Sequence, residues 1–589
     1  MASSAAASVA WRSWAGPLAL LPALLILPWA GGDFVAYQVA LFLLYGVAAQ
    51  GVALCWGQLG FLPLGHALFF GLGAYLSGGL LKAASHQALW LALLPLAVLL
   101  PAALAWIIAR LVFARSHRSG PYFSLITLAL TMLGALLANR FSALTGGFNG
   151  MTAIPELPGL ERYSTMYWAV AALALASTLA LSFMIRRPVG VLWSAIAQNE
   201  DRLQFFGFAT DRIKARAFAL SALCAAAAGA LFAPLLGIVT PQALGFVLST
   251  EFVIWAAVGG KSSPLGALLG AVLVGYASSE LRDHFASWEV IVAVAFILVV
   301  RFLPEGVSGW FASRVSPSSR APASPILAPT LLHRSSRETD EPSLRFEGVK
   351  SAHAGVAILN DLSLRFEGPG VRCLIGPNGA GKTSAFNVLT GRLPAQSGRM
   401  QLGGREVSGW SAWRVARAGI GRKFQIPSVF ARLTVRENLA IALWANRLHG
   451  WQALASSPLR WHTLLLDEML RLFPALAEHL DEPAGQLSQG DRQALEFVMT
   501  VLPEPRLMLL DEPCAGLSSA ETQRMMQAIA WVTRRIGAAA LVIEHDMGAV
   551  EAIAERVYVM HQGRLLAEGV LAEVQAHAAV RAVYAGGRK

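Results

Sequence analysis

Charged side chains are scarce in this sequence. Asp, Glu, Lys and Arg make up 14% of its 589 residues, whereas hydrophobic types make up 55%. Such a low charge density is unusual for a water-soluble chain of this length, and it indicates that part of the chain lies in a lipid bilayer. The formal net charge is +11. In a membrane protein this excess is typical of loops that face anionic cytoplasmic lipid.

Cysteine is also rare, and its four residues lie far apart. Cys55, Cys224, Cys373 and Cys514 lack the close spacing of a zinc or redox motif. We interpret them as small buried apolar side chains, and nothing indicates a disulfide framework. The interleaved aromatic and basic residues of a nucleic-acid groove are missing too, so no nucleic-acid partner is expected.

Long apolar runs dominate the first half of the chain. They follow one another from Pro17 to Phe302 with short breaks. At about 20 residues per crossing, this stretch holds about eight to ten membrane spans. Basic residues gather at Arg110 to Arg118 and between Arg186 and Arg216, so both stretches should face the cytoplasm. The sequence therefore predicts an all-α, multi-pass transmembrane domain over residues 1–310.

Two interruptions of these apolar runs have functional interest. The second basic stretch has helical spacing in "LWSAIAQNEDRLQFF", which predicts either a docking helix beneath the membrane or an amphipathic helix resting on lipid headgroups. The predicted docking residues are Leu192, Ile196, Leu203, Phe205 and Phe206. The later "GGKSSPLG" predicts a broken or re-entrant segment, or a simple kink.

The second half of the chain has a different character. Residues 311–342 are rich in Pro, Ser and Arg without sustained periodicity, which is typical of a linker. Residues 343–589 alternate β-rich runs such as "VRCLIG", "LMLLDE" and "ALVIEH" with helical patterns. This alternation predicts an α/β domain.

A phosphate-loop pattern lies in this second domain. "GPNGAGKTS" follows the apolar strand "VRCLI" and leads into the helical "AFNVLTG". Its glycines let the backbone curl so that several N–H groups point at phosphates. Lys382 is predicted to reach the β- and γ-phosphates of ATP, and Thr383 to offer its hydroxyl to Mg²⁺. The predicted ATP-binding residues are Gly376, Pro377, Asn378, Gly379, Ala380, Gly381, Lys382, Thr383 and Ser384.

Two further strands end in polar residues that suit phosphate chemistry. "RLMLLDEP" places Asp511 for the magnesium shell and Glu512 to orient or deprotonate the attacking water. "LVIEHDM" places His545 where it could touch the γ-phosphate or the water. Solvated acids at a strand end and a structural histidine are the alternatives.

Together these residues resemble the nucleotide-binding domain of ATP-binding cassette (ABC) transporters. The fold is then a P-loop ABC ATPase domain fused after a permease. The resemblance implies that "LSQGD" is the signature motif, with residues Leu487, Ser488, Gln489, Gly490 and Asp491. In a head-to-tail dimer, Ser488 and Gly490 would cap ATP bound to the partner's phosphate loop, which a helix N-terminus can do by hydrogen bonding.

The resemblance also gives a role to Gln425 in "GIGRKFQIPSVF". It matches the family's Q-loop glutamine, which joins the Mg²⁺ and water environment beside the surface that meets the membrane partner. Its neutral amide can donate and accept, and "IPSVF" could pack on a docking helix. The adenine-stacking aromatic of the family falls near His353, with Phe346 the nearest phenylalanine upstream. "CAGLSS" departs from the family's aspartate after the acid pair.

The membrane half resembles permeases that import branched-chain amino acids and, in a related branch, urea and short amides. The matching stretches include "GQLGFLPLGHALFFGLGAY" and "AAVGGKSSPLGALLGA". "GIVTP", "GIGRKFQIPSVF" and the late "VIEHDM" run favour the urea-type branch over branched-chain amino acids, although "LSQGDRQ" departs from that branch. A half-size exporter and a non-transport membrane ATPase are the rival classes.

The resemblance further implies an assembly. One permease and one cassette make half a transporter, so we expect a second permease subunit, a second ATPase subunit and a periplasmic solute-binding protein, although a homodimer would also complete the pair. The expected location is the bacterial inner membrane, in contact with its lipid, with the ATPase domain in the cytoplasm. Fusion fixes a one-to-one stoichiometry of permease and ATPase.

Overall fold

The computed structural model describes residues 2–83, 87–115, 121–285, 287–315, 330–331, 341–353 and 355–586. The chain divides into two compact units. The first, the helical unit, comprises Met1–Ala197 and Thr210–Ile326. The second, the α/β unit, comprises Gln198–Ala209 and Leu327–Lys589. Most of the predicted linker, residues 316–329 and 332–340, lies outside the described residues.

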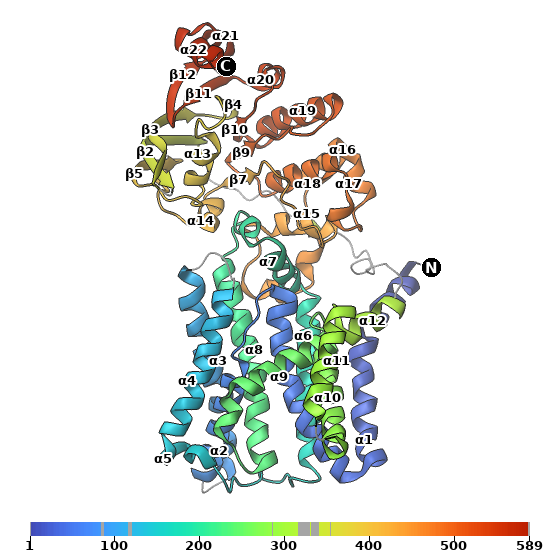
Figure 1. Cartoon of the computed structure of the whole chain (residues 1–589). Helices are drawn as coiled ribbons and strands as arrows, with labels where there is room; N and C mark the ends of the chain where they lie inside the picture. Colours follow the sequence, from blue (N-terminus) through green and yellow to red (C-terminus); the bar gives the residue numbers. More distant parts are fainter. Residues whose placement is uncertain are drawn as a thin grey trace. The chain divides into compact units, whose positions relative to one another are not determined.

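The helical unit is built from apolar helices with short connections (Figure 1). Its helices are α1 (Ala2–Ala53), α2 (His66–Ala83), α3 (Gln87–Arg115), α4 (Pro121–Arg140), α5 (Ser142–Thr145), α6 (Met166–Ile185), α7 (Pro188–Gln204, which continues into the α/β unit), α8 (Thr210–Leu236), α9 (Phe246–Gly259), α10 (Pro264–His284), α11 (Trp288–Phe302) and α12 (Gly306–Val315). A π-helical turn (Leu54–Gln58) extends α1, and 3₁₀ turns lie at Gly147–Asn149 and Pro241–Leu244.

Six helical segments within the described ranges are long and apolar enough to cross a membrane, fewer than the eight to ten expected from the runs of apolar residues. The difference has a geometric reason. Two apolar helices, α9 and α11, have only 14 and 15 residues, which at 1.5 Å per residue is shorter than a hydrocarbon core of about 30 Å. The α1 segment of 43 residues is broken at Gly32, whose φ is +74°.

Close helix packing in this unit depends on small residues. Helix α8 packs against α1, α2 and α3. A Cβ added at Gly229 of α8 would lie 1.9 Å from the Phe70 carbonyl oxygen, and one at Gly73 of α2 would lie 2.3 Å from the Ala226 carbonyl oxygen. Only glycine lets these two backbones approach so closely, as is typical of membrane helices.

The predicted interruption at "GGKSSPLG" is confirmed. Helix α9 ends at Gly259, Gly260 adopts a φ of +122°, and α10 begins at Pro264. The hydroxyl of Ser263 accepts the N–H of Gly266, which caps the new helix. The apolar run is therefore two helices rather than one kinked helix.

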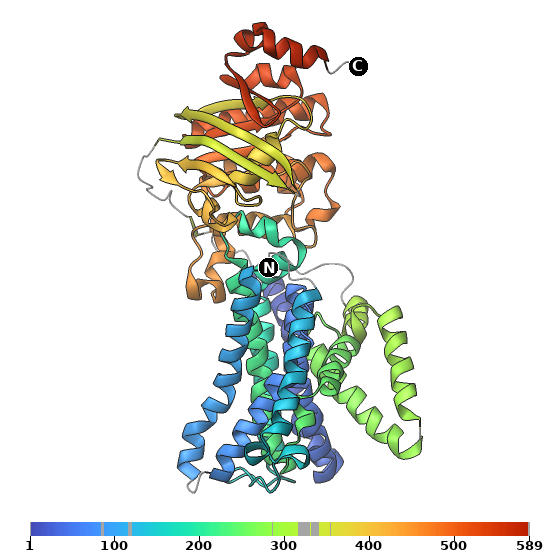
Figure 2. The ribbon, with the colours of Figure 1, turned by 60° about the vertical axis from the view of Figure 1, so that its left-hand side comes forward.

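Two larger sheets, a short parallel pair of strands (Thr330–Leu331 with Trp461–His462) and surrounding helices form the described part of the α/β unit. A six-stranded sheet has the order β12-β11-β4-β10-β9-β7, and a four-stranded antiparallel sheet has the order β3-β2-β5-β6. The yellow strands of the second sheet lie side by side in Figure 2. The strands are β1 (Thr330–Leu331), β2 (Ser343–His353), β3 (Val356–Glu367), β4 (Gly370–Ile375), β5 (Ser397–Leu402), β6 (Arg405–Glu406), β7 (Ile420–Lys423), β8 (Trp461–His462), β9 (Leu507–Asp511), β10 (Ala539–Ile543), β11 (Arg556–His561) and β12 (Arg564–Gly569).

The six-stranded sheet positions the candidate site. Strands β7, β9, β10, β4 and β11 are parallel, and only β12 runs antiparallel to its neighbour. Strands β4, β9 and β10 are buried along their whole length, as parallel strands covered on both faces should be. The helices of this unit are α13 (Lys382–Leu389), α14 (Ala412–Arg417), α15 (Val435–Trp444), α16 (Leu464–Leu472), α17 (Pro474–Glu478), α18 (Gln489–Val501), α19 (Ser519–Ile536), α20 (Met547–Ile553), α21 (Leu571–Ala576) and α22 (Ala578–Gly586).

Candidate functional site

The carboxyl ends of three parallel strands bring the predicted catalytic residues to one edge of the sheet. Ile543 at the end of β10 is in register with Leu374 near the end of β4 on one side and with Asp511 at the end of β9 on the other. The phosphate loop, the acid pair and His545 therefore leave the sheet at the same level. This is the edge where open parallel sheets bind ligands.

The phosphate loop has the backbone that its glycines permit. Gly376, Gly379 and Gly381 have φ values of +150°, +80° and +100°, and α13 begins at Lys382. A Cβ at Gly376 would lie 2.2 Å from the Met560 carbonyl oxygen. Glycine is thus required there both by conformation and by space. The loop and the helix N-terminus together present N–H groups and positive potential to an anion.

Lys382 is held inside this loop. Its Nζ donates to the carbonyl oxygens of Gly376 at 2.6 Å and Pro377 at 3.1 Å, and the residue is 7% exposed. Burial lowers the pKa of Lys382, while Glu512 and Asp511 act in the opposite direction. A cation enclosed by its own loop fits the phosphate group of a nucleotide as its counter-ion.

Thr383 and Asp511 place two side-chain oxygens next to each other. The Thr383 hydroxyl lies 3.4 Å from Asp511 Oδ1, to which it donates a hydrogen bond. Asp511 is 1% exposed, and burial raises its pKa, with Arg422 opposing that effect. Hydroxyl and carboxylate oxygens fit Mg²⁺, which takes few protein ligands and completes its shell with water and phosphate.

The side chain of Glu512 joins the three residues predicted to be catalytic. Its Oε2 accepts from Gln425 Nε2 at 3.0 Å, and its Oε1 lies 2.9 Å from His545 Nε2. Its φ is +45°, unusual for a residue with a side chain, and its N–H donates to the carbonyl of Ile543 at 2.9 Å. Gln425 was also predicted as a Mg²⁺ ligand, but its amide nitrogen is directed to Glu512 rather than to the Thr383–Asp511 pair.

A cavity of about 460 Å³ opens beside Glu512. Its lining comprises Gln425, Ile426, Pro427, Gln489, Arg492, Gln493, Glu512, Ala515 and Gly516. Arg492 and Gln493 were not predicted, because they follow the signature stretch without belonging to it. Their position about one turn into α18, beside the loop that contains Gln425, is a tertiary feature that local pattern does not reveal.

The signature stretch begins helix α18. Ser488 is the N-cap, its hydroxyl accepting the N–H of Asp491 at 3.1 Å and donating to Asp491 Oδ2 at 2.6 Å. Leu487 is buried, whereas Ser488 and Gln489 are exposed. A Cβ at Gly490 would lie 2.3 Å from Glu521 Oε1. Exposure of this helix start is what a contact with a second cassette needs.

The adenine-stacking role of His353 stays a prediction. Phe346, the alternative upstream phenylalanine, is 4% exposed and belongs to the hydrophobic core of the α/β unit, so it cannot stack on a base. His353 ends β2, but its side chain lies outside the described residues.

The predicted docking helix differs from expectation. Helix α7 is interrupted at Asn199, where φ is −157° and ψ is 87°, and it ends at Gln204. The residues after the break, Gln198–Ala209, form part of the α/β unit, and we call them the docking segment. All five predicted docking residues are buried, but Leu192 and Ile196 belong to the helical unit, while Leu203, Phe205 and Phe206 belong to the docking segment. The kink therefore divides the predicted continuous face.

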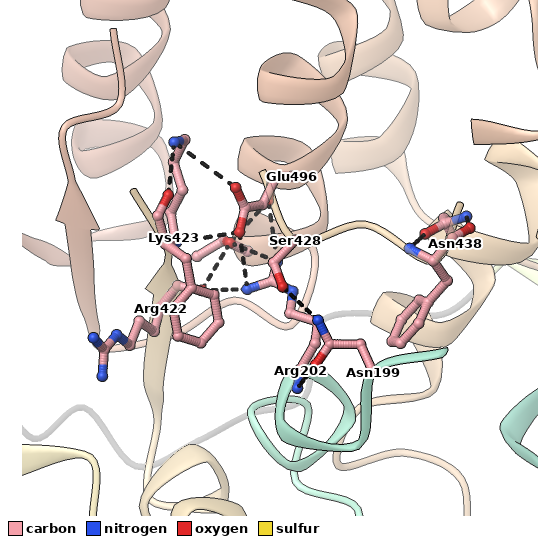
Figure 3. Close-up of polar contacts among 10 residues, drawn as sticks. Asn199, Arg202, Arg422, Lys423, Ser428, Asn438 and Glu496 are labelled. Carbon is pink, nitrogen blue, oxygen red and sulfur yellow. Dashed lines mark hydrogen bonds and ion pairs between the residues drawn. The ribbon is translucent and has the colours of Figure 1, made fainter. Parts of the chain in front are cut away.

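Polar contacts hold the docking segment in the α/β unit. Asn199 Nδ2 donates to Ser428 Oγ at 2.8 Å, and Asn199 Oδ1 accepts the N–H of Arg202 at 2.9 Å (Figure 3). Arg417 Nε donates to the Gly207 carbonyl at 2.8 Å. The side-chain amide of Asn199 therefore makes one hydrogen bond with its nitrogen and another with its oxygen at the kink. Apolar packing of "IPSVF" was expected here, whereas Ser428 of that stretch makes a hydrogen bond with its hydroxyl.

The apolar part of this contact centres on Phe424. The Phe205 and Phe424 rings meet edge to face with centroids 5.1 Å apart. Ile426 is 79% exposed, so the predicted packing of "IPSVF" on the docking helix is wrong for its first residue. Phe424, which precedes Gln425, makes the aromatic contact with the docking segment that was expected of the residues after Gln425.

Three polar residues of the helical unit make hydrogen bonds within that unit. His66 Nε2 lies 3.0 Å from Ser221 Oγ, and Gln58 Nε2 donates to the Ser262 carbonyl at 2.9 Å. Asn139 Nδ2 donates to the carbonyl four residues before it. Such contacts are typical of polar residues that pack between membrane helices.

Both units match known families. Residues 34–301 match the family model described as the permease component of the branched-chain amino acid transport system. Residues 359–515 match the model described as ABC transporter. Neither match supports the rival classes, a half-size exporter or a non-transport membrane ATPase.

Individual relatives cover the α/β unit. The high-affinity branched-chain amino acid transport ATP-binding protein LivG of Salmonella typhimurium is 34% identical over 251 residues, which is 42% of this chain and 98% of that protein. The corresponding BraF protein of Pseudomonas aeruginosa is 32% identical over 255 residues, again 42% and 98%. A solved ATP-binding cassette of an ABC transporter in its ADP conformation is 25% identical and covers 42% of this chain and 99% of that one, with a TM-score of 0.36.

These matches extend over the permease region and almost the whole length of the curated ATP-binding proteins. The chain therefore belongs to the ABC transporter family, within the branched-chain amino acid importer group, and it fuses a membrane-embedded permease to an ATP-hydrolysing cassette.

Proposed function

We propose that this chain imports branched-chain amino acids, with ATP hydrolysis in its cassette driving the permease. The main support for this substrate is the match of residues 34–301 to the branched-chain amino acid permease model. The similarity of the cassette to LivG and BraF supports the same substrate. The preference for urea or a short amide, which rested on short phrases of sequence, has no support of this kind. Urea remains the alternative that the experiment below tests.

The proposed hydrolysis uses residues at the sheet edge. Lys382 and the loop N–H groups hold the ATP phosphates. Thr383 and Asp511 hold Mg²⁺, which when bound neutralises phosphate charge. Glu512 takes the proton of the attacking water, and His545, 2.9 Å from its Oε1, orients that carboxylate or contacts the γ-phosphate.

The proposed assembly needs a second cassette. Ser488, which is exposed at the start of α18, and Gly490 would cap ATP on the partner's phosphate loop, so the functional unit contains two permeases and two cassettes. A periplasmic solute-binding protein would deliver the amino acid. We place the permease in the bacterial inner membrane, with lipid around it and the cassette in the cytoplasm.

Uptake of labelled leucine and labelled urea at low external concentration tests the substrate. Cells with the gene should take up leucine faster than cells without it, and cells that carry Glu512→Gln should resemble the deletion. Loss of urea uptake alone would reverse the substrate assignment while keeping the importer. Loss of neither would contradict both.

A further inference from the structure

A buried ion cluster joins the docking segment to the loop that carries Gln425. Arg202 of the docking segment is 1% exposed, and its Nη1 lies 3.5 Å from Oε1 of the fully buried Glu496 on α18. Its Nη2 lies 3.3 Å from Thr500 Oγ1, and its Nη1 also donates to the carbonyl oxygen of Arg422. In Figure 3 the Arg202 side chain points from the docking segment to Glu496. The cassette thus buries a charge that belongs to the permease half of the sequence.

Glu496 connects this charge to the catalytic carboxylate. Its Oε1 also accepts the backbone N–H of Phe424 at 3.1 Å. Phe424 directly precedes Gln425, whose Nε2 donates to Glu512 Oε2 at 3.0 Å. A continuous path therefore leads from Arg202 through Glu496, the Phe424 N–H and Gln425 to Glu512. Each step is an ion pair, a hydrogen bond or a single peptide unit.

The charge balance of the cluster makes it sensitive to Arg202. Lys423 is fully buried, and its Nζ lies 3.8 Å from Glu496 Oε2, an oxygen that has no hydrogen-bond partner. If Arg202 withdraws, Glu496 loses the nearest of its cations, so the carboxylate and Lys423 must move closer together. Because Lys423 is bonded to Phe424 and donates to its carbonyl at 3.2 Å, that movement shifts the start of the Gln425 loop.

The docking segment is the part of the cassette that permease movement can displace. It is joined at both ends, through Ala197 and Thr210, to the helical unit. Its other polar anchors are the Asp201–Arg392 pair at 2.8 Å, about one third exposed, and hydrogen bonds such as Asn199 to Ser428. An exposed pair contributes little, whereas a buried charge pair fixes geometry strongly.

We propose that Arg202 and Glu496 are positioning residues for ATP hydrolysis. With the docking segment seated, Arg202 fixes Glu496, Glu496 fixes the Phe424 N–H, and Gln425 then holds Glu512 for reaction. When the segment withdraws, Gln425 loses this support and hydrolysis slows while ATP still binds. The inference rests on the proposed catalytic role of Glu512, and it adds a regulator that contacts neither nucleotide nor metal.

The first test is steady-state ATP hydrolysis by the full-length transporter in lipid nanodiscs. Arg202→Met should lower kcat about tenfold and leave the KM for ATP within about twofold, because only catalytic geometry is disturbed. Arg202→Lys keeps the charge but loses the planar guanidinium group, so its kcat should lie between those of the wild type and Arg202→Met. Arg436→Met is the matched control, since Arg436 pairs with Asp481 on the cassette surface, and its kinetics should equal those of the wild type.

The second test separates positioning from a merely structural role. In a Gln425→Ala background, Arg202→Met should cause no further loss of kcat, because the path to Glu512 is already cut. A tenfold loss in both backgrounds, or a kcat unaffected by Arg202→Met alone, would overturn the proposal. If Arg202→Met fails to bind nucleotide because it does not fold, Arg202→Lys in the two backgrounds gives the same comparison.

A third variant keeps this inference distinct from the catalytic assignment. Normal turnover in Glu512→Gln would contradict the proposed role of Glu512, whatever Arg202 does. Slow turnover in Glu512→Gln together with additive effects of Arg202→Met and Gln425→Ala would leave the catalytic assignment intact and remove only the positioning role. The two failures therefore have different signatures.

Discussion

Glu512 and Glu496 contact the same short loop of the cassette, but their surroundings are opposite. The Glu512 side chain is 21% exposed and its described partners, Gln425 and His545, are a neutral amide and an imidazole. Glu496 is fully buried and faces the cations of Arg202 and Lys423. A group that must exchange protons with water needs access and adjustable partners, whereas a group that fixes geometry needs burial and strong ones. The difference separates a chemical role from a positional one.

The largest effect should come from the exposed carboxylate. Glu512→Gln removes the proposed base, so we expect ATP hydrolysis to fall about 10²–10⁴-fold with nucleotide binding retained. Single-turnover hydrolysis and equilibrium binding of ATP measure the two quantities. Glu568→Gln, an exposed position on β12, is the matched control and should hydrolyse normally. Equal losses of binding and turnover would show that Glu512 is needed for the fold of the site.

The buried carboxylate should matter first for stability. Glu496→Gln leaves Arg202 and Lys423 buried without a counter-charge, and breaking a buried ion cluster in this way costs about 3–5 kcal/mol. Thermal unfolding of the purified protein, followed by a signal from the cassette, should give a clearly lower midpoint. Glu512→Gln, measured in the same way, should change it little. A reversed order of the two variants would remove the contrast drawn above.

A smaller effect is expected from pH at the proposed Mg²⁺ site. Burial raises the pKa of Asp511, because the neutral acid is favoured in a dry environment. Protons therefore compete with Mg²⁺ at a higher pH than they would at an ordinary aspartate. The Mg²⁺ concentration that half-activates hydrolysis should rise as the pH falls from neutrality towards the raised pKa of Asp511. A Mg²⁺ requirement that stays constant as the pH falls would contradict the assignment of Asp511.

The smallest effect should come from an exposed ion pair. Arg436 Nε lies 2.9 Å from Asp481 Oδ1, and about half of each side chain is exposed. Arg436 lowers the pKa of Asp481, so the contribution of the pair is present at neutral pH and disappears as the pH falls through that lowered value. Arg436→Met should cost less than about 1 kcal/mol. Comparison with Glu496→Gln by denaturant unfolding would sharpen the difference between exposed and buried pairs.

The catalytic edge was largely predictable. The phosphate loop, Asp511, Glu512 and His545 each follow an apolar run, and parallel strands deliver such residues to a common edge. The position of Glu512 in particular can be predicted from the fact that it directly follows β9. The residues that sequence analysis missed, Arg202, Glu496 and Arg492, lie within helical patterns where a charged side chain normally indicates an exposed face. The burial of Arg202 and Glu496 depends on what packs against them.

The membrane half was predictable in kind but not in detail. Apolar runs gave an all-α, multi-pass domain and the interruption after Gly259. The described residues contain fewer long apolar helices than the eight to ten spans that were expected, because α9 and α11 are shorter than the apolar runs indicate. Helix ends depend on glycine conformations and packing partners, such as the φ of +122° at Gly260, that composition does not specify.

By itself, the sequence determined the two-part organisation, the α/β cassette and the residues that meet at its catalytic edge. Hydrophobic periodicity and motif spacing are local properties of the chain, and strand ends obey simple geometry. Only the tertiary structure decided that the docking helix breaks at Asn199, that Phe424 packs on Phe205, and that Arg202 is buried against Glu496. Each of these three features depends on a contact between residues more than 200 positions apart in the chain. The free energy of burying a charge depends on the partner that such a distant segment supplies, and the neighbours of the charge in the sequence do not reveal that partner.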